Sequence, residues 1–131
     1  MLACDIRIAA DTARFSFPET GLAITPGFGG TQRLARLTQA SYAMDLIFTG
    51  RRIKGEEALE KGIINRLVPA IELMDEAWKM AEGIAAKASL GVRMAKEAIL
   101  RGLDLDLEKG LEVEAELFAE CFNSSDQKDA M

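Results

Sequence analysis

A run of prolines and glycines between residues 15 and 34 constrains the backbone more than any other part of the chain. An alternating apolar segment ends there, Pro18 begins a turn, and Glu19 places a carboxylate directly after that proline. The segment Pro26-Gly27-Phe28-Gly29-Gly30 then leads into apolar residues with helical spacing. Clustered glycines after a proline predict a backbone that bends or lies close to another group. Their amide N–H groups, beside a helix start, can face an anion, a polarised oxygen or a bound water.

Composition narrows the class of protein. With 131 residues, 49% of them apolar, the chain is long enough for one domain with a hydrophobic core. The formal charge is -5, and acidic and basic residues are interspersed, which argues against a nucleic-acid partner. No apolar run is long enough to span a bilayer, and no signal-peptide pattern follows Met1. We therefore expect no membrane partner and a cytoplasmic location, with an organelle as the alternative if Met1 is not the natural start.

The chain contains no histidine. This excludes Ser-His and Cys-His nucleophile pairs within it, as well as the usual zinc sites. Cys4 and Cys121 lie near opposite ends without metal-type spacing, so we expect buried thiols rather than a disulfide or a ligand pair. Acid–base catalysis within this chain would have to use carboxylates, lysines, Tyr42, or backbone and water. The sequence therefore predicts no metal site.

Apolar periodicity predicts short strands followed by several helices. Residues 4–9 and 13–17 alternate between apolar and polar, which predicts two strands joined around residues 10–12. Such a pair is marginal alone and needs a larger sheet, yet only residues 63–68 look strand-like downstream. We therefore expect missing sequence; the alternative is that helices or another subunit cover the sheet edge. Helices are predicted over residues 31–49, 55–61 and 89–102, from just after Pro69, and from Leu107 to Phe122.

The spacing within these helices also predicts their buried faces. The expected core-facing residues are Leu34, Leu37, Ser41, Met44 and Phe48 in the first helix, and Leu107, Leu111, Ala115, Phe118 and Phe122 in the last. Four glutamates spaced four apart in the last helix predict a solvated face rather than a metal or proton site. Residues 123–126 have the composition of a helix cap, but the chain ends at Met131, too soon for a stable helix. We therefore expect the chain to be cut at both ends.

A set of short motifs in a fixed order covers nearly the whole chain. The first are Cys4 to Ala9, Phe17-Pro18-Glu19 with Gly21, and Pro26 to Leu34. Further matching segments are Thr49-Gly50-Arg51-Arg52-Ile53, Glu57-Ala58, Lys61 to Asn65, Val68-Pro69 and Ala95-Lys96-Glu97. This order resembles the enoyl-CoA hydratase/isomerase (crotonase) family, and in particular its carboxyl-terminal half. Dinucleotide-binding and P-loop patterns are absent, because Gln32 falls where the third glycine would be and no lysine follows the cluster.

The resemblance implies an α/β fold, a crotonase-like spiral of ββα units that is incomplete at the amino end. We expect a single partial domain over residues 1–131, with 1–69 as the end of the spiral core and 70–131 as a truncated helical region. The implied assembly is a homotrimer or hexamer. The implied activity is that of an enoyl-CoA hydratase, a lyase of fatty acid β-oxidation that reversibly adds water to trans-2-enoyl-CoA in the syn sense. The implied partner is an acyl-CoA thioester, and no cofactor is expected beyond the coenzyme A that the substrate carries.

The resemblance also assigns roles to single residues. Family hydratases use two glutamates across a bound water, and Glu19 matches the one that serves the proton at C2. Gly27 matches the position whose backbone N–H meets that water, and Pro26 and Phe28 are candidates for the acyl pocket. The first glutamate and both oxyanion donors match segments ahead of Met1.

Other interpretations of the same residues stay open. Composition alone favours a solvent-exposed carboxylate after a turn for Glu19, and only the family resemblance favours a catalytic role. Gly29 and Gly30 can serve only loop geometry, and Asp5 is a structural strand residue rather than a third catalytic acid. At the level of function, the first alternative is an enoyl-CoA isomerase that uses Glu19 as its main acid–base group. The second, from another class, is a catalytically silent fragment or an assembly module that pairs with a separate amino-terminal half.

Overall fold

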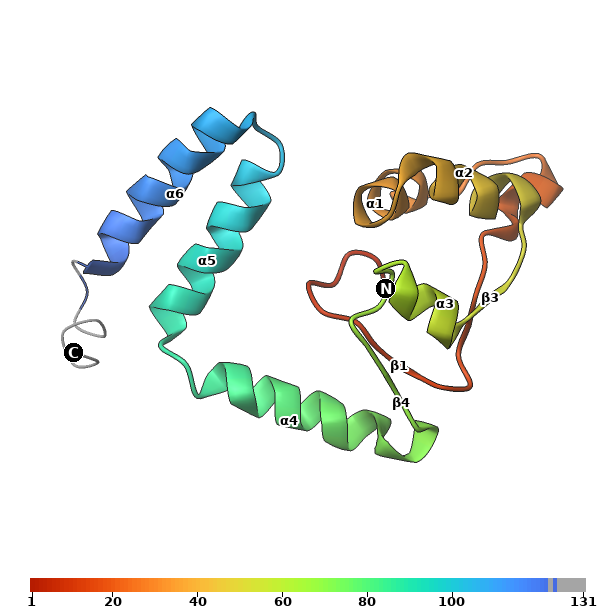
Figure 1. Ribbon diagram of the computed structural model, residues 1–131, viewed down its shortest axis with the longest axis horizontal. Helices are drawn as coiled ribbons and strands as arrows, with labels where there is room; N and C mark the ends of the chain where they lie inside the picture. Colours follow the sequence, from red (N-terminus) through yellow and green to blue (C-terminus); the bar gives the residue numbers. More distant parts are fainter. Residues whose placement is uncertain (123, 125–131) are drawn as a thin grey trace. The chain divides into compact units, whose positions relative to one another are not determined.

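The computed structural model describes residues 1–122 and 124 (Figure 1). The chain forms two compact units, Met1–Ala77 and Trp78–Met131, which are described separately below. The single-domain prediction stays a prediction, and of the cap predicted at residues 123–126 only Ser124 is described. Within the described residues, no helix is long and apolar enough to cross a membrane.

The strands of the first unit form two separate two-stranded sheets. β1 (Ile8–Ala10) pairs in parallel with β4 (Arg66–Val68), and β2 (Arg14–Phe15) pairs antiparallel with β3 (Ile53–Lys54). The strand predicted within residues 63–68 is confirmed as β4, but the expected pairing of the first two strands is wrong. The backbone N–H of Asp11 donates to the carbonyl of Val68, which continues the β1–β4 ladder, and the chain then turns so that β2 meets another partner.

The first predicted helix is two helices, α1 (Gly30–Leu37) and α2 (Ala40–Thr49). The break lies at Thr38, whose backbone is extended and whose hydroxyl donates to the carbonyl of Leu34 at 2.9 Å. The break changes the phase of the buried face. Met44 and Phe48, predicted to be buried, are exposed, and the buried residues of α2 are Ala43, Leu46 and Ile47.

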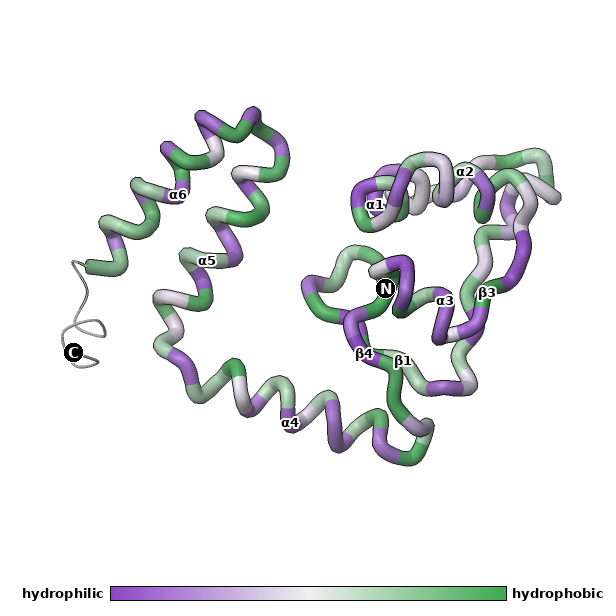
Figure 2. Tube along the Cα trace, viewed as in Figure 1, coloured by the Kyte–Doolittle hydropathy of each residue, from purple (hydrophilic) through white to green (hydrophobic). Residues whose placement is uncertain are grey.

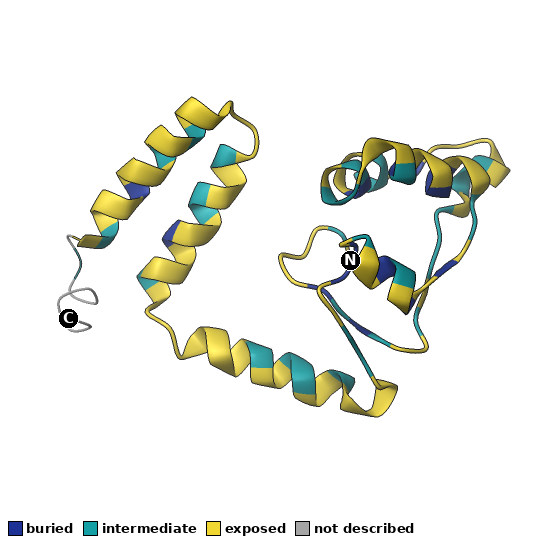
Figure 3. Ribbon diagram, viewed as in Figure 1, coloured by how far each residue is buried: buried dark blue, intermediate teal, exposed yellow. Residues whose placement is uncertain are grey.

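The remaining elements of the first unit follow the predicted order. α3 (Gly55–Glu60) and β4 lie where the sequence places them, with the left-handed Gly62 between them. Two short 3-10 turns are added, η1 (Pro18–Leu22) and η2 (Ala70–Glu72). The core gathers residues from α1, α2, β3, α3 and the segment before β4, drawn in dark blue in Figure 3. Its side chains with the lowest exposure among the large residues are Leu34, Leu46, Ile53 and Ile63.

A buried arginine ties the start of the chain to this core. Arg7 is only 7% exposed, and its Nε donates to the carbonyl of Ile63 at 2.6 Å. Its Nη1 donates to the carbonyl of Cys4 at 2.6 Å, and its backbone N–H to Asn65 Oδ1 at 2.8 Å. Arg7 therefore satisfies backbone carbonyls that would otherwise lose hydrogen bonds on burial.

A second polar group, the Arg51 cluster of Tyr42, Asp45, Arg51 and Glu57, ties α2 to α3. The Arg51 guanidinium contacts Asp45 Oδ2 at 2.7 Å and Glu57 Oε1 at 2.8 Å. The Tyr42 hydroxyl donates to the same Glu57 oxygen at 2.9 Å. Burial and this hydrogen bond raise the pKa of Tyr42 to about 12, and the Arg51 guanidinium lowers the pKa of Glu57.

The second unit is helical. α5 (Ser89–Gly102) packs against α6 (Leu107–Phe122), with Met94 and Leu117 buried between them. Apolar and polar residues alternate along both helices (Figure 2). The predicted stripe on α6 is wrong, since Leu107, Leu111, Phe118 and Phe122 are all at least half exposed. The helix carries apolar residues on more than one face, and periodicity alone does not say which face is covered.

α4 (Leu73–Ala85) begins in the first unit and ends in the second, and none of its residues is buried.

The cysteine prediction is wrong for Cys4, which is exposed, while Cys121 is partly buried and both thiols are free. Among the described residues no group of histidine, cysteine or carboxylate side chains could hold a metal ion.

Replacing Arg7 should destabilise the first unit. Arg7→Met keeps much of the aliphatic stem but removes the donors to the buried carbonyl of Ile63 and the partly buried carbonyl of Cys4. A buried group left unpaired costs about 1–3 kcal/mol. Urea unfolding should show a clearly lower midpoint for Arg7→Met than for the natural protein. Arg36→Met, on the exposed face of α1, is the matched control and should change stability by less than about 0.5 kcal/mol. Equal effects of the two substitutions would contradict the role of Arg7.

Tyr42 should make stability depend on alkaline pH. Its folded-state pKa of about 12 lies above the ordinary tyrosine pKa of about 10, so its contribution to stability is fully present below about pH 10. The contribution is lost as pH rises toward the folded value, because the folded state holds the phenol proton more tightly. Urea unfolding of the natural protein and of Tyr42→Phe should therefore differ most below this range and converge within it. A difference that does not change with pH would contradict the assignment.

Candidate active site

Glu19 lies in a short 3-10 turn that precedes the glycine-rich loop. The turn, η1, begins with Pro18, whose fixed φ suits the first position of a helical turn. Ala23, in the left-handed conformation with φ 59, closes it, and its N–H donates to the carbonyl of Thr20 at 3.1 Å. The N–H of Ile24 reaches the carbonyl of Glu19 at 3.3 Å. The backbone around Glu19 is therefore defined by local hydrogen bonds on its carboxyl-terminal side.

The carboxylate of Glu19 is partly buried. Its Oε2 atom is inaccessible to solvent and accepts no hydrogen bond from any side chain or backbone group in the described part of the chain. A buried polar atom without a partner costs about 1–3 kcal/mol, so proteins keep such atoms where a further group uses them. This orientation is unlike that of a solvated surface carboxylate.

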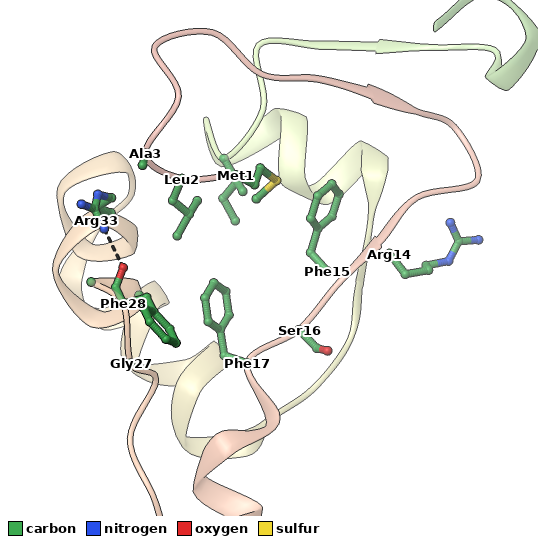
Figure 4. Close-up of a pocket in the computed structure, with 13 residues that line it drawn as sticks. Met1, Leu2, Ala3, Arg14, Phe15, Ser16, Phe17, Gly27, Phe28 and Arg33 are labelled. Carbon is green, nitrogen blue, oxygen red and sulfur yellow. Dashed lines mark hydrogen bonds between the residues drawn. The ribbon is translucent and has the colours of Figure 1, made fainter.

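The loop from Pro26 to Gly30 is held by backbone and side-chain hydrogen bonds. The N–H of Gly30 donates to the carbonyl of Gly27 at 3.0 Å. Arg33 Nη1 donates to the carbonyl of Phe28 at 2.7 Å, which is the dashed line in Figure 4. Arg33 of α1 therefore anchors the loop that precedes this helix.

Different physical constraints act at the positions of the three glycines in this loop. Gly29 has φ 80, a conformation that favours glycine. A Cβ on Gly30 would lie 2.9 Å from Pro26 Cβ, so only glycine allows the loop to close there. A Cβ on Gly27 would meet nothing within 4 Å. Loop geometry is thus confirmed for Gly29 and Gly30, whereas packing within this chain does not require glycine at position 27.

A cavity of about 590 Å³ lies beside the loop. The aromatic rings of Phe15 and Phe17 face it together with Met1 and Leu2 (Figure 4). Gly27 and Phe28 are among its lining residues, while Glu19 and Pro26 are not. The structure thus brings two of the four predicted site residues to one apolar cavity and leaves Glu19 on the neighbouring turn.

Phe28 is unusual in both backbone and exposure. Its φ is 51, which strains a residue with a Cβ, and its side chain is fully exposed. Pro26, by contrast, is buried against the loop. A strained backbone that presents an aromatic ring to its surroundings is typical of a contact with another molecule.

One residue of the site could not be found from the sequence. The hydroxyl of Thr20, next to Glu19, donates to the carbonyl of Ile47 in α2 at 2.8 Å. A threonine in a turn gives no signal of such a partner, because the bond joins residues 27 positions apart. The only available signal is the position of Thr20 directly after the candidate carboxylate.

The chain is similar to known proteins along its whole length. The family model of enoyl-CoA hydratase/isomerase matches residues 1–131. The chain is 51% identical over 130 residues to the short-chain-enoyl-CoA hydratase of Clostridium acetobutylicum, covering 99% of this chain and 50% of that protein. It is 44% identical to the crotonyl-CoA hydratase of Syntrophomonas wolfei, again covering 99% of this chain and 50% of the relative.

Solved structures agree with this assignment. The crystal structure of enoyl-CoA hydratase from Bacillus anthracis matches with a TM-score of 0.96 and 45% identity, covering 98% of this chain and 50% of that one. The chain thus spans about half the length of these relatives. The match confirms the predicted α/β, crotonase-like fold. The chain belongs to the enoyl-CoA hydratase/isomerase family.

Proposed function

We propose that this chain provides part of the active site of an enoyl-CoA hydratase, which adds water reversibly to trans-2-enoyl-CoA and gives 3-hydroxyacyl-CoA. The observation that carries the proposal is the buried, unpartnered Oε2 of Glu19, one turn before the glycine-rich loop. Relatives from Clostridium acetobutylicum and Syntrophomonas wolfei are named as hydratases of short-chain enoyl-CoA and crotonyl-CoA, which supports the same reaction.

Glu19 acts as one of two acid–base carboxylates. Water addition to a conjugated thioester needs a proton donor for C2 and a proton acceptor for the attacking water, and Glu19 serves the proton at C2. The backbone N–H of Gly27 holds the water; the open space around this glycine supports that role. A buried carboxylate oxygen without a partner suits proton transfer, because no group among the described residues forms a competing hydrogen bond with it.

Two neighbouring residues shape the pocket for the acyl chain. Phe28 presents its exposed ring beside the cavity, which suits contact with an apolar chain. Pro26 is buried beneath the loop and fixes the path of the backbone there. Their apolar character and their position next to Gly27 support this assignment.

The reaction also needs a second carboxylate and hydrogen-bond donors for the thioester oxygen, where negative charge develops. By the family resemblance, these groups match segments other than residues 1–131. The substrate is an acyl-CoA thioester, and no cofactor is needed beyond its coenzyme A.

We further propose a homotrimer or hexamer and a cytoplasmic location. Relatives from Arabidopsis thaliana and Dictyostelium discoideum carry names that include the word mitochondrial, so an organelle is the alternative location.

An isomerase is the second candidate, because the matching family model includes both activities. The two reactions differ in their products. Hydration of an enoyl-CoA adds the mass of one water, whereas moving the double bond leaves the mass unchanged. Mass spectrometry of products formed from 2-enoyl-CoA and 3-enoyl-CoA therefore distinguishes them.

Substituting Glu19 tests the proposal directly. Glu19→Gln, made in the natural protein, should lower kcat for crotonyl-CoA hydration by at least about 10²-fold, as expected for a positioned proton-transfer group. The rate is followed by loss of the enoyl-thioester absorbance. Glu56→Gln, which neutralises an exposed carboxylate in the first turn of α3, is the control and should leave the rate unchanged. A folded Glu19→Gln protein with normal turnover would remove Glu19 from the mechanism.

Gly27→Ala separates the loop's function from its stability. In the described part of the chain the added methyl group meets no atom within 4 Å beyond its sequence neighbours, so the unfolding midpoint should stay within the range of a surface change. The same methyl group would enter the space where water and substrate meet, so kcat/KM for crotonyl-CoA should fall at least about 10-fold, as for a small misplacement of reacting groups. Gly83→Ala, which also meets nothing within 4 Å, is the matched control. Unchanged kcat/KM in Gly27→Ala would contradict the role of this position.

A further inference from the structure

The carboxyl end of α2 is completed by a residue from the turn that carries Glu19. Helix ends leave carbonyl groups without intrahelical partners. The carbonyl of Leu46 accepts the N–H of Gly50 at 3.0 Å. The carbonyl of Ile47 accepts the hydroxyl of Thr20 at 2.8 Å, in a partly buried environment. The bond therefore satisfies one orphan carbonyl and links η1 to α2.

A second contact lies on the other side of Glu19. Gly50 ends α2 in the left-handed conformation with φ 62. A Cβ at this position would lie 3.4 Å from Pro18 Cα and 3.7 Å from the carbonyl oxygen of Phe17. The backbones of η1 and of the end of α2 are therefore in close contact. Glu19 is flanked by Pro18, against Gly50, and by Thr20, bonded to Ile47.

Within the turn, the described backbone hydrogen bonds from Ala23 and Ile24 hold its carboxyl-terminal side. A 3-10 turn has poorer hydrogen-bond geometry than an α-helix, and Phe17 at its amino end has no side-chain group that could cap it. α2 is in turn held to α3 by the Arg51 cluster. The position of Glu19 therefore depends on contacts with α2 rather than on the turn alone.

We infer that Thr20 is a positioning residue, whose hydroxyl bond to Ile47 fixes the orientation of the Glu19 carboxylate relative to the Gly27 loop. The inference rests on the proposed function of Glu19. We do not place Thr20 in contact with the reacting atoms. It acts by holding the backbone from which Glu19 projects, so its loss should lower the rate of proton transfer and leave substrate binding nearly unchanged.

The test compares two substitutions of Thr20 in the natural protein. Thr20→Val keeps the shape of the side chain but removes the donor, and kcat for crotonyl-CoA should fall about 10- to 10²-fold with KM changed less than about two-fold, since small misplacements at a reacting centre have effects of this size. Thr20→Ser restores the hydroxyl and should recover kcat to within about three-fold of the natural protein. Full kcat in Thr20→Val, or a loss that appears only in KM, would overturn the inference.

Thr38→Val is the matched control for stability. The Thr38 hydroxyl also donates to a helix carbonyl, that of Leu34 at 2.9 Å, but it belongs to the break between α1 and α2 and not to η1. Each valine substitution removes a hydroxyl hydrogen bond, but the Leu34 carbonyl keeps the backbone N–H of Thr38, so Thr38→Val should lower the unfolding midpoint no more than Thr20→Val does. Only Thr20→Val should lower kcat. A similar loss of kcat in both would mean that Thr20 acts through general stability, against the inference.

Two further measurements separate this inference from the proposed function. Amide hydrogen exchange at Ala23 and Ile24, whose N–H groups donate within the turn, should be faster in Thr20→Val, whether or not Glu19 is catalytic. In a Glu19→Gln background, Thr20→Val should lower kcat by less than about two-fold further, because it acts through Glu19. If Thr20→Val shows faster exchange but normal kcat while Glu19→Gln is inactive, the positioning role of Thr20 is overturned and the proposed function of Glu19 is not. Normal kcat in Glu19→Gln overturns the proposed function itself.

Discussion

The contact between η1 and the carboxyl end of α2 is the constraint on which the candidate site depends. A short 3-10 turn cannot hold a carboxylate in place by itself, but here Pro18 packs on Gly50 and Thr20 bonds to Ile47. α2 contributes Leu46 and Ile47 to the core, so the site is built on a buried helix. The precision of the site therefore comes from the core of the first unit.

The family and the fold class were predicted from the motif resemblance, and the order of most elements was predicted from local chemistry. Proline at 18, glycine at 29 and 62, and the strand-like composition of residues 63–68 each have one simple structural meaning. The helix break at Thr38 was missed because the apolar spacing continues across it. The β2–β3 pair was missed because β3 is only two residues long, too short to show a period.

The site was predicted less completely than the fold. Glu19 and Gly27 follow from the family resemblance, and composition alone does not distinguish Glu19 from a surface carboxylate. The sequence also treats the loop glycines alike, whereas the structure separates Gly30, which packs on Pro26, from Gly27, which meets nothing. Thr20 could not be predicted, since its partner is distant in the sequence and the bond depends on the tertiary fold.

The proposed function requires that Glu19 and Gly27 meet at one reacting centre. The most direct measurement is a crystal structure of the natural protein with a bound 3-hydroxyacyl-CoA or a non-reactive analogue. We expect the hydroxyl oxygen, or the water in its place, to lie within about 3.2 Å of the Gly27 nitrogen. We expect Glu19 to lie on the same side of the acyl chain, with a carboxylate oxygen in hydrogen-bond reach of the reacting atoms. A ligand whose reacting carbons lie away from both residues would contradict it.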